Sequence, residues 1–266
     1  MLTLSEIWIY PIKSLGGIRL DEAHVQLRGL QFDRRWMIVD DTGRFVTQRS
    51  LHRMALLDVA LEQDRVLIID RTNPADVLEV PMQPVSNEVL QVSIWDDHEV
   101  TALTVSDQAD QWLSTKLDLP VRLVYMPDST ERRVDPRYAQ NEEVVSFADG
   151  YPFLLIGQAS LDDLNSKLSE PISMRRFRPN LVVRGAAPFA EDDWRGIRIG
   201  DLTFEAVKPC ARCVLTTVNP ETAQPGPEPL KTLATYRKRN NKIYFGQNLL
   251  TSTTGRIAVG DLVQIG

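Results

Sequence analysis

Short runs of alternating apolar and polar residues, separated by turn signals, dominate the first hundred positions of the chain. Between two of these runs, Asp40-Asp41-Thr42-Gly43 is typical of a hairpin turn in which Gly43 adopts a positive φ. The runs that fit strands are 4–10, 18–27, 35–39, 44–48, 55–61, 65–69, 77–80, 89–94 and 100–105. Strands this short and this closely spaced predict a barrel or a sandwich.

Helical signals are few and lie mainly in the second half. The first predicted helix runs from Ser106 as N-cap to about Leu117, a second begins at Ser160 as N-cap, and a third covers Pro229 to Arg237. Further strands fit 180–184, 197–199, 202–207, 213–218, 243–245 and 256–265. We therefore expect a mainly β protein with a few helices. Leu119-Pro120 stops the first helix and marks the best boundary, which predicts domains over 1–118 and 119–266.

Composition excludes several classes of protein. The 266 residues include 30 Lys and Arg against 36 Asp and Glu, a net charge of −6, and charged residues make up 25% of the chain. This is typical of a folded globular protein, and the acidic balance argues against general nucleic-acid binding. No apolar stretch is long enough to span a membrane, and Glu6 stands where a signal peptide has a basic segment. We expect a cytoplasmic protein that binds no membrane.

Two cysteines, Cys210 and Cys213, are the most informative chemical feature. A zinc knot needs four ligands, but His24, His52 and His98 are scattered without ligand spacing. A thioredoxin-type dithiol begins a helix, whereas Cys213 opens the β-branched run 213–218. Both of these interpretations are disfavoured rather than excluded, and two others fit the residues better. The pair could be buried as small apolar residues, or one thiolate could hold a metal whose other ligands come from a cofactor.

Cationic and amide-rich loops are the second chemical feature. Lys13 and Ser14 precede two glycines at the end of a strand, where backbone N–H groups can surround an anion. Arginine forks suit phosphate groups, and side-chain amides suit the edge of a heterocycle. The candidate residues are Lys13, Ser14, Arg34, Thr47, Arg49, Arg178, Asn180, Gln247 and Asn248. An anionic cofactor that carries sulfur or metal would fit all of these features together.

Five motifs in order resemble one family over nearly the whole chain. They are Tyr10-Pro11-Ile12-Lys13-Ser14, Asp33-Arg34-Arg35-Trp36, Phe177-Arg178-Pro179-Asn180, Glu191-Asp192-Asp193-Trp194 and the stretch 210–218 that begins Cys-Ala-Arg-Cys. This pattern is similar to MOSC-domain proteins with an N-terminal MOSC β-barrel domain, typified by the mitochondrial amidoxime-reducing component and its bacterial relatives. The resemblance implies an N-terminal barrel-like domain followed by a C-terminal MOSC β-barrel.

The resemblance also implies a cofactor and a reaction. The family binds a molybdenum–pyranopterin (molybdopterin-type) cofactor, and the position of its cysteine ligand falls on Cys213, which is thereby both the metal ligand and the catalytic residue. Its phosphate-binding motifs fall on Lys13, Ser14 and Arg34, and its Arg-Pro-Asn motif on Arg178 and Asn180. Thr47, Arg49, Gln247 and Asn248 are weaker correspondences. The implied function is reduction of small N-hydroxylated substrates by a molybdenum-dependent oxidoreductase; pyridoxal phosphate is not expected.

The sequence differs from the family pattern at two positions, and it leaves an alternative function open. Asn219 and Ala223 replace an aspartate and a glycine that the family commonly has after the ligand motif. No cysteine follows Cys213 for an iron–sulfur cluster, so electrons are expected from a separate flavin or iron–sulfur reductase. Asp149 and Asn219 are further candidates near the pocket. The alternative function is a sulfur-carrier or molybdenum-cofactor-delivery protein in which Cys213 holds a persulfide.

Overall fold

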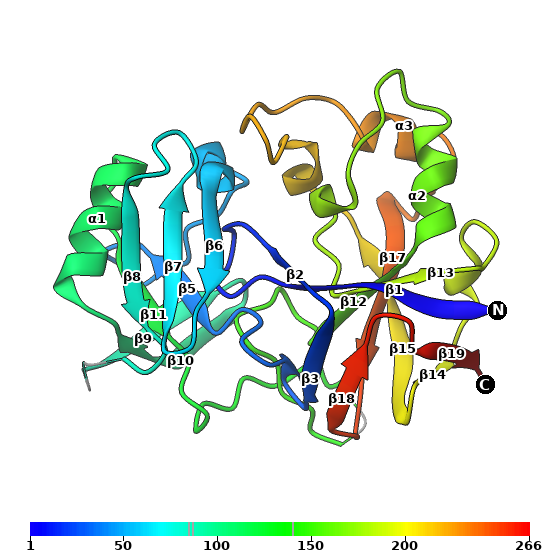
Figure 1. Cartoon of the computed structure of the whole chain (residues 1–266), viewed down its shortest axis with the longest axis horizontal. Coiled ribbons are helices and arrows are strands. Elements are labelled where there is room, and N and C mark those ends of the chain that lie inside the picture. The colour runs from blue at the N-terminus through cyan, green and yellow to red at the C-terminus, as the bar shows by residue number, and fades with distance from the viewer. Residues whose placement is uncertain (85, 87, 140) are drawn as a thin grey trace.

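A sheet that closes on itself forms the right half of the molecule in Figure 1. The computed structural model describes residues 1–84, 86, 88–139 and 141–266. Within them the closed barrel has seven strands, in the order β12 (Phe153–Gly157), β13 (Leu181–Arg184), β1 (Leu2–Ile9), β19 (Leu262–Ile265), β14 (Gly196–Ile199), β15 (Leu202–Ala211) and β17 (Lys242–Leu250). Pairing of β17 with β12 closes the ring, and β2 (Ile18–Leu20) and β16 (Lys238–Arg239) extend it. The first strand of the chain, β1, is therefore one of the seven strands of a barrel whose other strands all come from the second half of the sequence.

Three smaller sheets make up the rest of the β structure. A four-stranded sheet has the order β5 (Trp36–Val39), β11 (Arg122–Tyr125), β10 (Asp97–Thr104) and β9 (Val89–Ile94). A three-stranded sheet has β6 (Leu57–Leu61), β7 (Arg65–Asp70) and β8 (Val77–Pro81). The third joins β18 (Gly255–Ala258) to β3 (Glu22–Gln26) and β4 (Gly29–Leu30). Figure 1 shows this third sheet at the lower centre, where residues from both ends of the chain meet.

Helices are short and few among the described residues. The α-helices are α1 (Asp107–Leu117), α2 (Gln158–Asn165) and α3 (Leu230–Ala234), and the 3₁₀ turns are η1 (His52–Leu56), η2 (Met174–Arg176), η3 (Ala190–Asp192) and η4 (Val214–Thr217). The predicted fold class, mainly β with a few helices, is confirmed. The domain division at residue 118 stays a prediction; β11, which follows it, pairs with β5 and β10.

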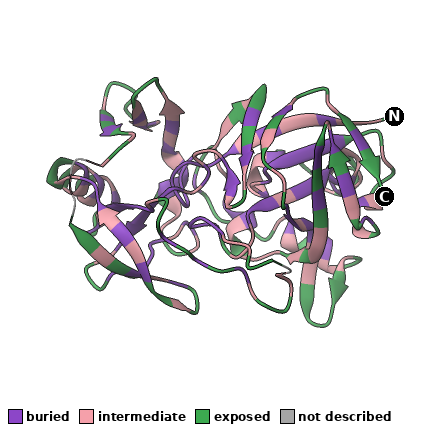
Figure 2. Ribbon diagram, turned by 90° about the horizontal axis from the view of Figure 1, so that it is seen from below, coloured by how far each residue is buried: buried purple, intermediate pink, exposed green. Residues whose placement is uncertain are grey.

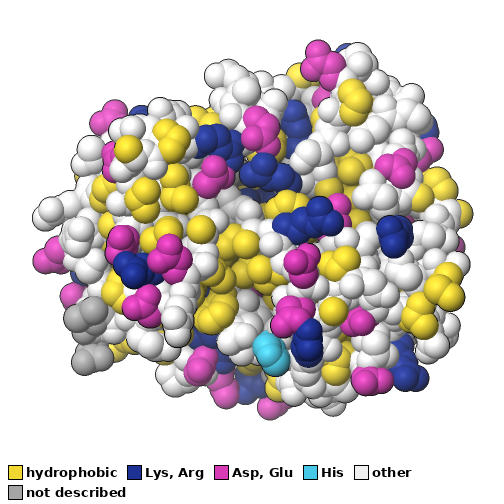
Figure 3. Space-filling view, in the orientation of Figure 1, with side chains coloured by type: hydrophobic (Ala, Val, Ile, Leu, Met, Phe, Trp, Pro, Cys, Tyr) yellow, Lys and Arg dark blue, Asp and Glu magenta, His cyan; other side chains and the backbone are white. Residues whose placement is uncertain are grey.

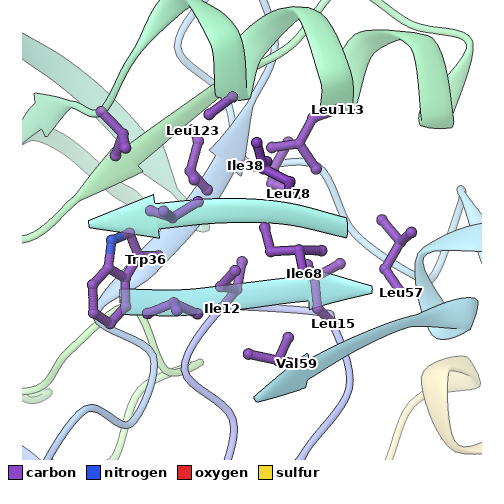
Figure 4. Packing of buried hydrophobic residues seen from close by; sticks show 14 of the residues in the cluster. Ile12, Leu15, Trp36, Ile38, Leu57, Val59, Ile68, Leu78, Leu113 and Leu123 are labelled. Carbon is purple, nitrogen blue, oxygen red and sulfur yellow. The ribbon is translucent and has the colours of Figure 1, made fainter. Parts of the chain in front are cut away.

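The core of the left half lies between α1 and the strands below it. Ser106 begins α1 as predicted, because its Oγ accepts a hydrogen bond from the Ala109 N–H at 3.2 Å. Figure 4 shows Leu113 of α1 above Ile38, Leu123 and Leu78, all fully or almost fully buried. A fully buried leucine contributes about 1.5–3 kcal/mol. Figure 2 shows that buried residues also lie along the strands of both halves, between residues that are partly or fully exposed.

Several predicted boundaries were wrong. The run 44–48 is not a strand, since it makes only isolated bridges from Arg44 and Phe45, although Gly43 does have a positive φ of 77°. The runs 18–27 and 256–265 are each split into two strands, and 55–61 begins as η1. Ser160 does not cap α2. The helix begins at Gln158, and the Ser160 Oγ donates to Glu191 instead.

The prediction of a strand over Cys213–Val218 was also wrong. Strand β15 ends at Ala211, Cys213 is the N-cap residue of η4, and Val214 to Thr217 form a 3₁₀ turn. The Thr216 and Thr217 hydroxyls donate to the carbonyls of Cys213 and Val214. Such local bonds give β-branched threonines an alternative to the strand that their propensity favours. Cys213 therefore lies on a tight turn that follows a barrel strand.

Candidate active site

A cavity of about 680 Å³ is lined by residues of both the N-terminal half and the barrel. Eight of the predicted site residues line it: Lys13, Ser14, Arg34, Arg49, Arg178, Asn180, Cys213 and Asn248. Thr47 and Gln247 are not among the lining residues. The space-filling view in Figure 3 shows Lys and Arg side chains gathered across the middle of the face it draws, between the two halves. Folding thus brings together positively charged residues that are far apart in the sequence.

Cys213 and Cys210 both line this cavity and both are half-buried, so neither is a fully buried apolar residue. The Arg49 Nε donates to the Cys213 Sγ at 3.2 Å, and the Arg212 Nη1 donates to the Cys210 Sγ at 2.9 Å. Each sulfur atom therefore has its own guanidinium. A thiolate is the reactive and metal-binding form of cysteine.

Asp149 connects the cations next to Cys213. Its carboxylate accepts from the Lys13 Nζ at 2.6 Å, the Arg49 Nη2 at 2.8 Å and the Trp95 Nε1 at 3.2 Å. The side chain keeps 60% of its surface open, because that surface faces the cavity. Protein atoms still surround the carboxylate closely enough for burial to favour a higher pKa. The charges and hydrogen bonds of Lys13 and Arg49 outweigh burial and hold the pKa of Asp149 well below its ordinary value.

Lys13 lies deeper than Asp149. Its ammonium donates to the Phe147 carbonyl at 2.8 Å as well as to Asp149, and its side chain is only 6% exposed. Burial lowers the pKa of Lys13 to about 8, against the opposing charge of Asp149. The loop that carries Asp149 is fixed in turn by Arg132, whose guanidinium donates to the carbonyls of Ser146 and Ala148 at 2.8 and 2.5 Å.

Arg34 and Arg178 both lie over the ring of Tyr10, with their guanidinium carbons 4.3 and 4.1 Å from its centroid. Arg34 is paired with the buried Asp33 at 2.6 Å. Arg178 donates one bond, from Nη1 to the Leu15 carbonyl, and its buried Nη2 has no partner among the described residues. Burial lowers the pKa of Arg178 to about 10. Arg178 thus keeps a buried donor that a bound anion could satisfy.

Four residues that line the cavity have a left-handed backbone conformation. Ser14, Arg34 and Arg178 have φ values of 68°, 50° and 55°, and Trp95 has 54°. Residues other than glycine rarely adopt this left-handed conformation, and it costs of order 1–3 kcal/mol at each position. All four line the cavity. Strain of this kind is typically found where a backbone is held for function.

The remaining predicted residues are engaged with other protein groups. The Asn180 amide bridges the Leu154 N–H and the Trp8 carbonyl, both at 3.2 Å. The Asn248 Nδ2 donates to the Lys208 carbonyl, also at 3.2 Å. Gln247 donates to Asp192, away from the cavity lining, and Thr47 Oγ1 accepts from the Arg49 Nη1 at 3.1 Å. The roles predicted for these side chains toward a cofactor stay predictions.

Several lining residues were missed from the sequence, among them Trp95 and Arg132, and Lys208 was noted only as a neighbour of the cysteine pair. Trp95 lies at the tip of the β9–β10 hairpin, 45% exposed, with the Arg49 guanidinium 4.4 Å from its ring centroid. Arg132 and Lys208 line the cavity from the segment after β11 and from β15. An alternating strand pattern gives no signal for a functional residue at a hairpin tip. Asn219, a candidate from the sequence, is not among the lining residues, and its Oδ1 accepts from the Glu221 N–H.

Ala223 has a φ of 58°, in the left-handed region where glycine is favoured. Its N–H donates to the Asn219 carbonyl at 2.8 Å, which closes the turn after η4.

The described residues contain no group of three or more His, Cys, Asp or Glu side chains that could hold a metal ion. None of their helices is both long and apolar enough to cross a membrane.

Two domain families match this chain. Residues 142–264 match the MOSC domain, and residues 1–120 match the MOSC N-terminal beta barrel domain. The mitochondrial amidoxime-reducing component 1 of Mus musculus is 34% identical over 99% of this chain and 82% of its own length. The Homo sapiens protein of the same name is 32% identical over the same shares. A solved structure, the YUAD protein of Bacillus subtilis, matches 99% of this chain and 94% of its own at 10% identity and a TM-score of 0.47.

The chain therefore belongs to the MOSC-domain family of amidoxime-reducing components.

Proposed function

We propose that this protein is a molybdenum-dependent oxidoreductase that reduces small N-hydroxylated compounds. The observation that supports the proposal most is the half-buried Cys213 thiol, which faces a strongly cationic cavity and accepts a 3.2 Å hydrogen bond from Arg49. The relatives named amidoxime-reducing components match nearly the full chain, and an amidoxime is an N-hydroxylated compound.

The cavity residues fit an anionic, sulfur-bearing cofactor. Eight Lys and Arg residues line the cavity against four Asp residues, although the whole chain is acidic. Buried donors without partners among the described residues include Arg178 Nη2 and Arg212 Nε. A phosphate group would satisfy such donors, and a thiolate is a soft ligand of the kind that suits a metal already held by sulfur.

In this proposal Cys213 is the protein ligand of the molybdenum in a molybdenum–pyranopterin cofactor. Lys13, Ser14 and Arg34 would hold the cofactor phosphate, and Arg178 and Asn180 would bind the rest of the cofactor. Thr47, Arg49, Gln247 and Asn248 would support them. When bound, the cofactor supplies the two-electron redox chemistry that cleaves the N–O bond of the substrate.

In this proposal the protein's own residues position the Cys213 sulfur, keep Lys13 charged and form a wall against which the substrate binds. Arg49 fixes the Cys213 sulfur through Nε and is itself fixed by Thr47 and Asp149. Asp149 keeps Lys13 charged, because without a neighbouring anion burial would favour the neutral amine. The exposed face of Trp95 offers an apolar wall for a substrate. Electrons would come from a separate flavin or iron–sulfur reductase, and a cytoplasmic location stays a prediction.

Elemental analysis combined with a turnover assay tests the proposal. Protein purified after cytoplasmic expression should carry about one molybdenum and one pterin per chain and should reduce benzamidoxime with a reduced viologen as electron donor. Protein that contains neither molybdenum nor pterin, and that releases sulfur from Cys213 on thiol treatment, would instead support the sulfur-carrier function.

A further inference from the structure

Lys208 is a cation in the cavity wall that forms no salt bridge with any acid in the described residues. Within the described part of the chain, its ammonium makes no hydrogen bond and no ion pair. It lies instead over two aromatic rings, with Nζ 4.4 Å from the centroid of Tyr138 and 5.4 Å from that of Tyr151. Cation–π contacts position an ammonium but leave its charge uncompensated.

The backbone of Lys208 is held in an irregular part of β15. The register with β17 shifts between Ala206 and Lys208 and again between Pro209 and Ala211. The Asn248 Nδ2 donates to the Lys208 carbonyl at 3.2 Å. Bulges of this kind are common beside active sites, where they redirect a side chain. The irregular register is therefore consistent with a lysine whose side chain is directed into the cavity rather than along the barrel.

Asp135 is the lining acid that interacts with Lys208, but another residue already uses its carboxylate. The Arg137 guanidinium donates to Asp135 from Nε at 3.0 Å and from Nη2 at 2.6 Å. Lys208 is only one of the weaker influences that lower the pKa of Asp135 to about 2. The positive charge of Lys208 is therefore available to a ligand.

Among the described residues, the other lining cations that form no salt bridge are Arg178 and Arg212. Arg212 donates to the Phe177 carbonyl at 2.6 Å, which places its guanidinium beside the Arg178 segment. Arg212 also donates to the Cys210 Sγ at 2.9 Å, whereas the Lys208 ammonium contacts the rings of Tyr138 and Tyr151. Arg212 and Lys208 therefore have different surroundings in the cavity wall.

We propose that Lys208, between Tyr138 and Tyr151, is a subsite for an anionic group of the substrate, so that the enzyme favours N-hydroxylated compounds bearing a carboxylate or a phosphate. This inference rests on the proposed function. The anion pairs with the ammonium, and the tyrosine rings keep the ammonium in place.

Two matched ligand sets test the subsite. In turnover, benzamidoxime is compared with 4-carboxybenzamidoxime. In direct binding by calorimetry, benzamide is compared with 4-carboxybenzamide and 4-phosphonobenzamide, none of which can be reduced as an N-hydroxylated substrate. Each comparison uses the wild type, Lys208→Met and the control Lys242→Met, whose lysine is exposed and does not line the cavity. The two charged benzamides distinguish a carboxylate from a phosphate as the favoured group.

The wild type and Lys242→Met should bind a charged benzamide at least tenfold more tightly than benzamide, and Lys208→Met should lose this preference. In turnover, Lys208→Met should raise the KM for 4-carboxybenzamidoxime about tenfold and leave benzamidoxime within twofold. An unchanged preference in Lys208→Met would overturn the subsite, as would loss of molybdenum from that variant. If no amidoxime is reduced but the binding preference behaves as expected, the proposed function fails and the subsite stands.

Discussion

Arg49 and Cys213 are 164 positions apart in the chain and are joined by a hydrogen bond of 3.2 Å from Nε to Sγ. The guanidinium that makes this bond also donates to Asp149 and lies 4.4 Å from the ring centroid of Trp95. One arginine therefore links the sulfur in the barrel to the acid and the indole on the opposite side of the cavity.

Replacing Arg49 should loosen this arrangement. In Arg49→Met, Cys213 loses its donor and Asp149 keeps only Lys13 and Trp95, so we expect the molybdenum content to fall severalfold. Metal analysis of protein purified in parallel measures this effect. Arg53→Met is the control, because Arg53 is exposed and lies outside the cavity lining. Full metal content in Arg49→Met would show that the bond to Cys213 does not contribute to cofactor retention.

Removing the charge of Asp149 should destabilise the fold in a pH-dependent way. Asp149→Asn leaves the buried Lys13 ammonium without its acid, which we expect to cost about 1–3 kcal/mol at pH 7. This is less than for a fully buried pair, because the carboxylate faces the open cavity.

The sign of the pH dependence follows from Lys13. Burial lowers its pKa to about 8 in the folded protein, below the ordinary value of 10.5, so the unfolded chain binds more protons between these values. The free energy of unfolding should rise with pH across that window. Without the acid the pKa of Lys13 in the folded variant falls below 8, so the deficit of Asp149→Asn should be largest at lower pH, shrink as the pH approaches about 8, and be nearly gone above it, where Lys13 is neutral in both proteins. Denaturant unfolding at several pH values tests this against Asp41→Asn, an exposed control; a deficit independent of pH would contradict it.

Substitutions of Trp95 should separate its backbone strain from its role in substrate binding. Its φ of 54° suits glycine, so Trp95→Gly should be about 1 kcal/mol more stable than Trp95→Ala. Both variants should raise the KM for benzamidoxime about tenfold, because each removes the aromatic wall. Trp95→Phe keeps a ring and should stay close to the wild type in KM. An alanine variant with wild-type KM would remove Trp95 from the substrate site.

Ala223 offers a test of the turn after η4. Because its φ is 58°, Ala223→Gly should stabilise the protein by about 0.5–1 kcal/mol, seen as a rise in Tm of a few degrees. Ala60→Gly in strand β6 is the control and should lower Tm, because glycine in a regular strand costs entropy. If Ala223→Gly is also destabilising, the alanine is not strained at this position.

The sequence was a good guide to the fold class and to which residues meet at the cavity. It was a poorer guide to the local backbone structure of those residues. Strand alternation identified the β architecture because each strand buries one face, as in Val66 and Ile68 of β7. Pairing of β1 with β13 and β19 could not be predicted, since it depends on contacts between the two ends of the chain. The motif residues Lys13, Arg34 and Arg178 do meet at one cavity.

Local propensity failed where side chains bond to nearby backbone. Thr216 and Thr217 favour a strand by β-branching, but their hydroxyls bond carbonyls three residues back and support a turn. Trp95 was missed for another reason. Its place in the site comes from its contacts with Arg49 and Asp149, which are distant in the sequence, and no sequence spacing records such contacts.

The central proposal is that Cys213 is the protein ligand of a molybdenum cofactor. Molybdenum per chain should therefore be compared among the wild type, Cys210→Ser and Cys213→Ser, all expressed and purified alike. We predict about one molybdenum per chain in the wild type and in Cys210→Ser, and almost none in Cys213→Ser, because the serine removes the soft thiolate ligand. Full molybdenum in Cys213→Ser would contradict the account.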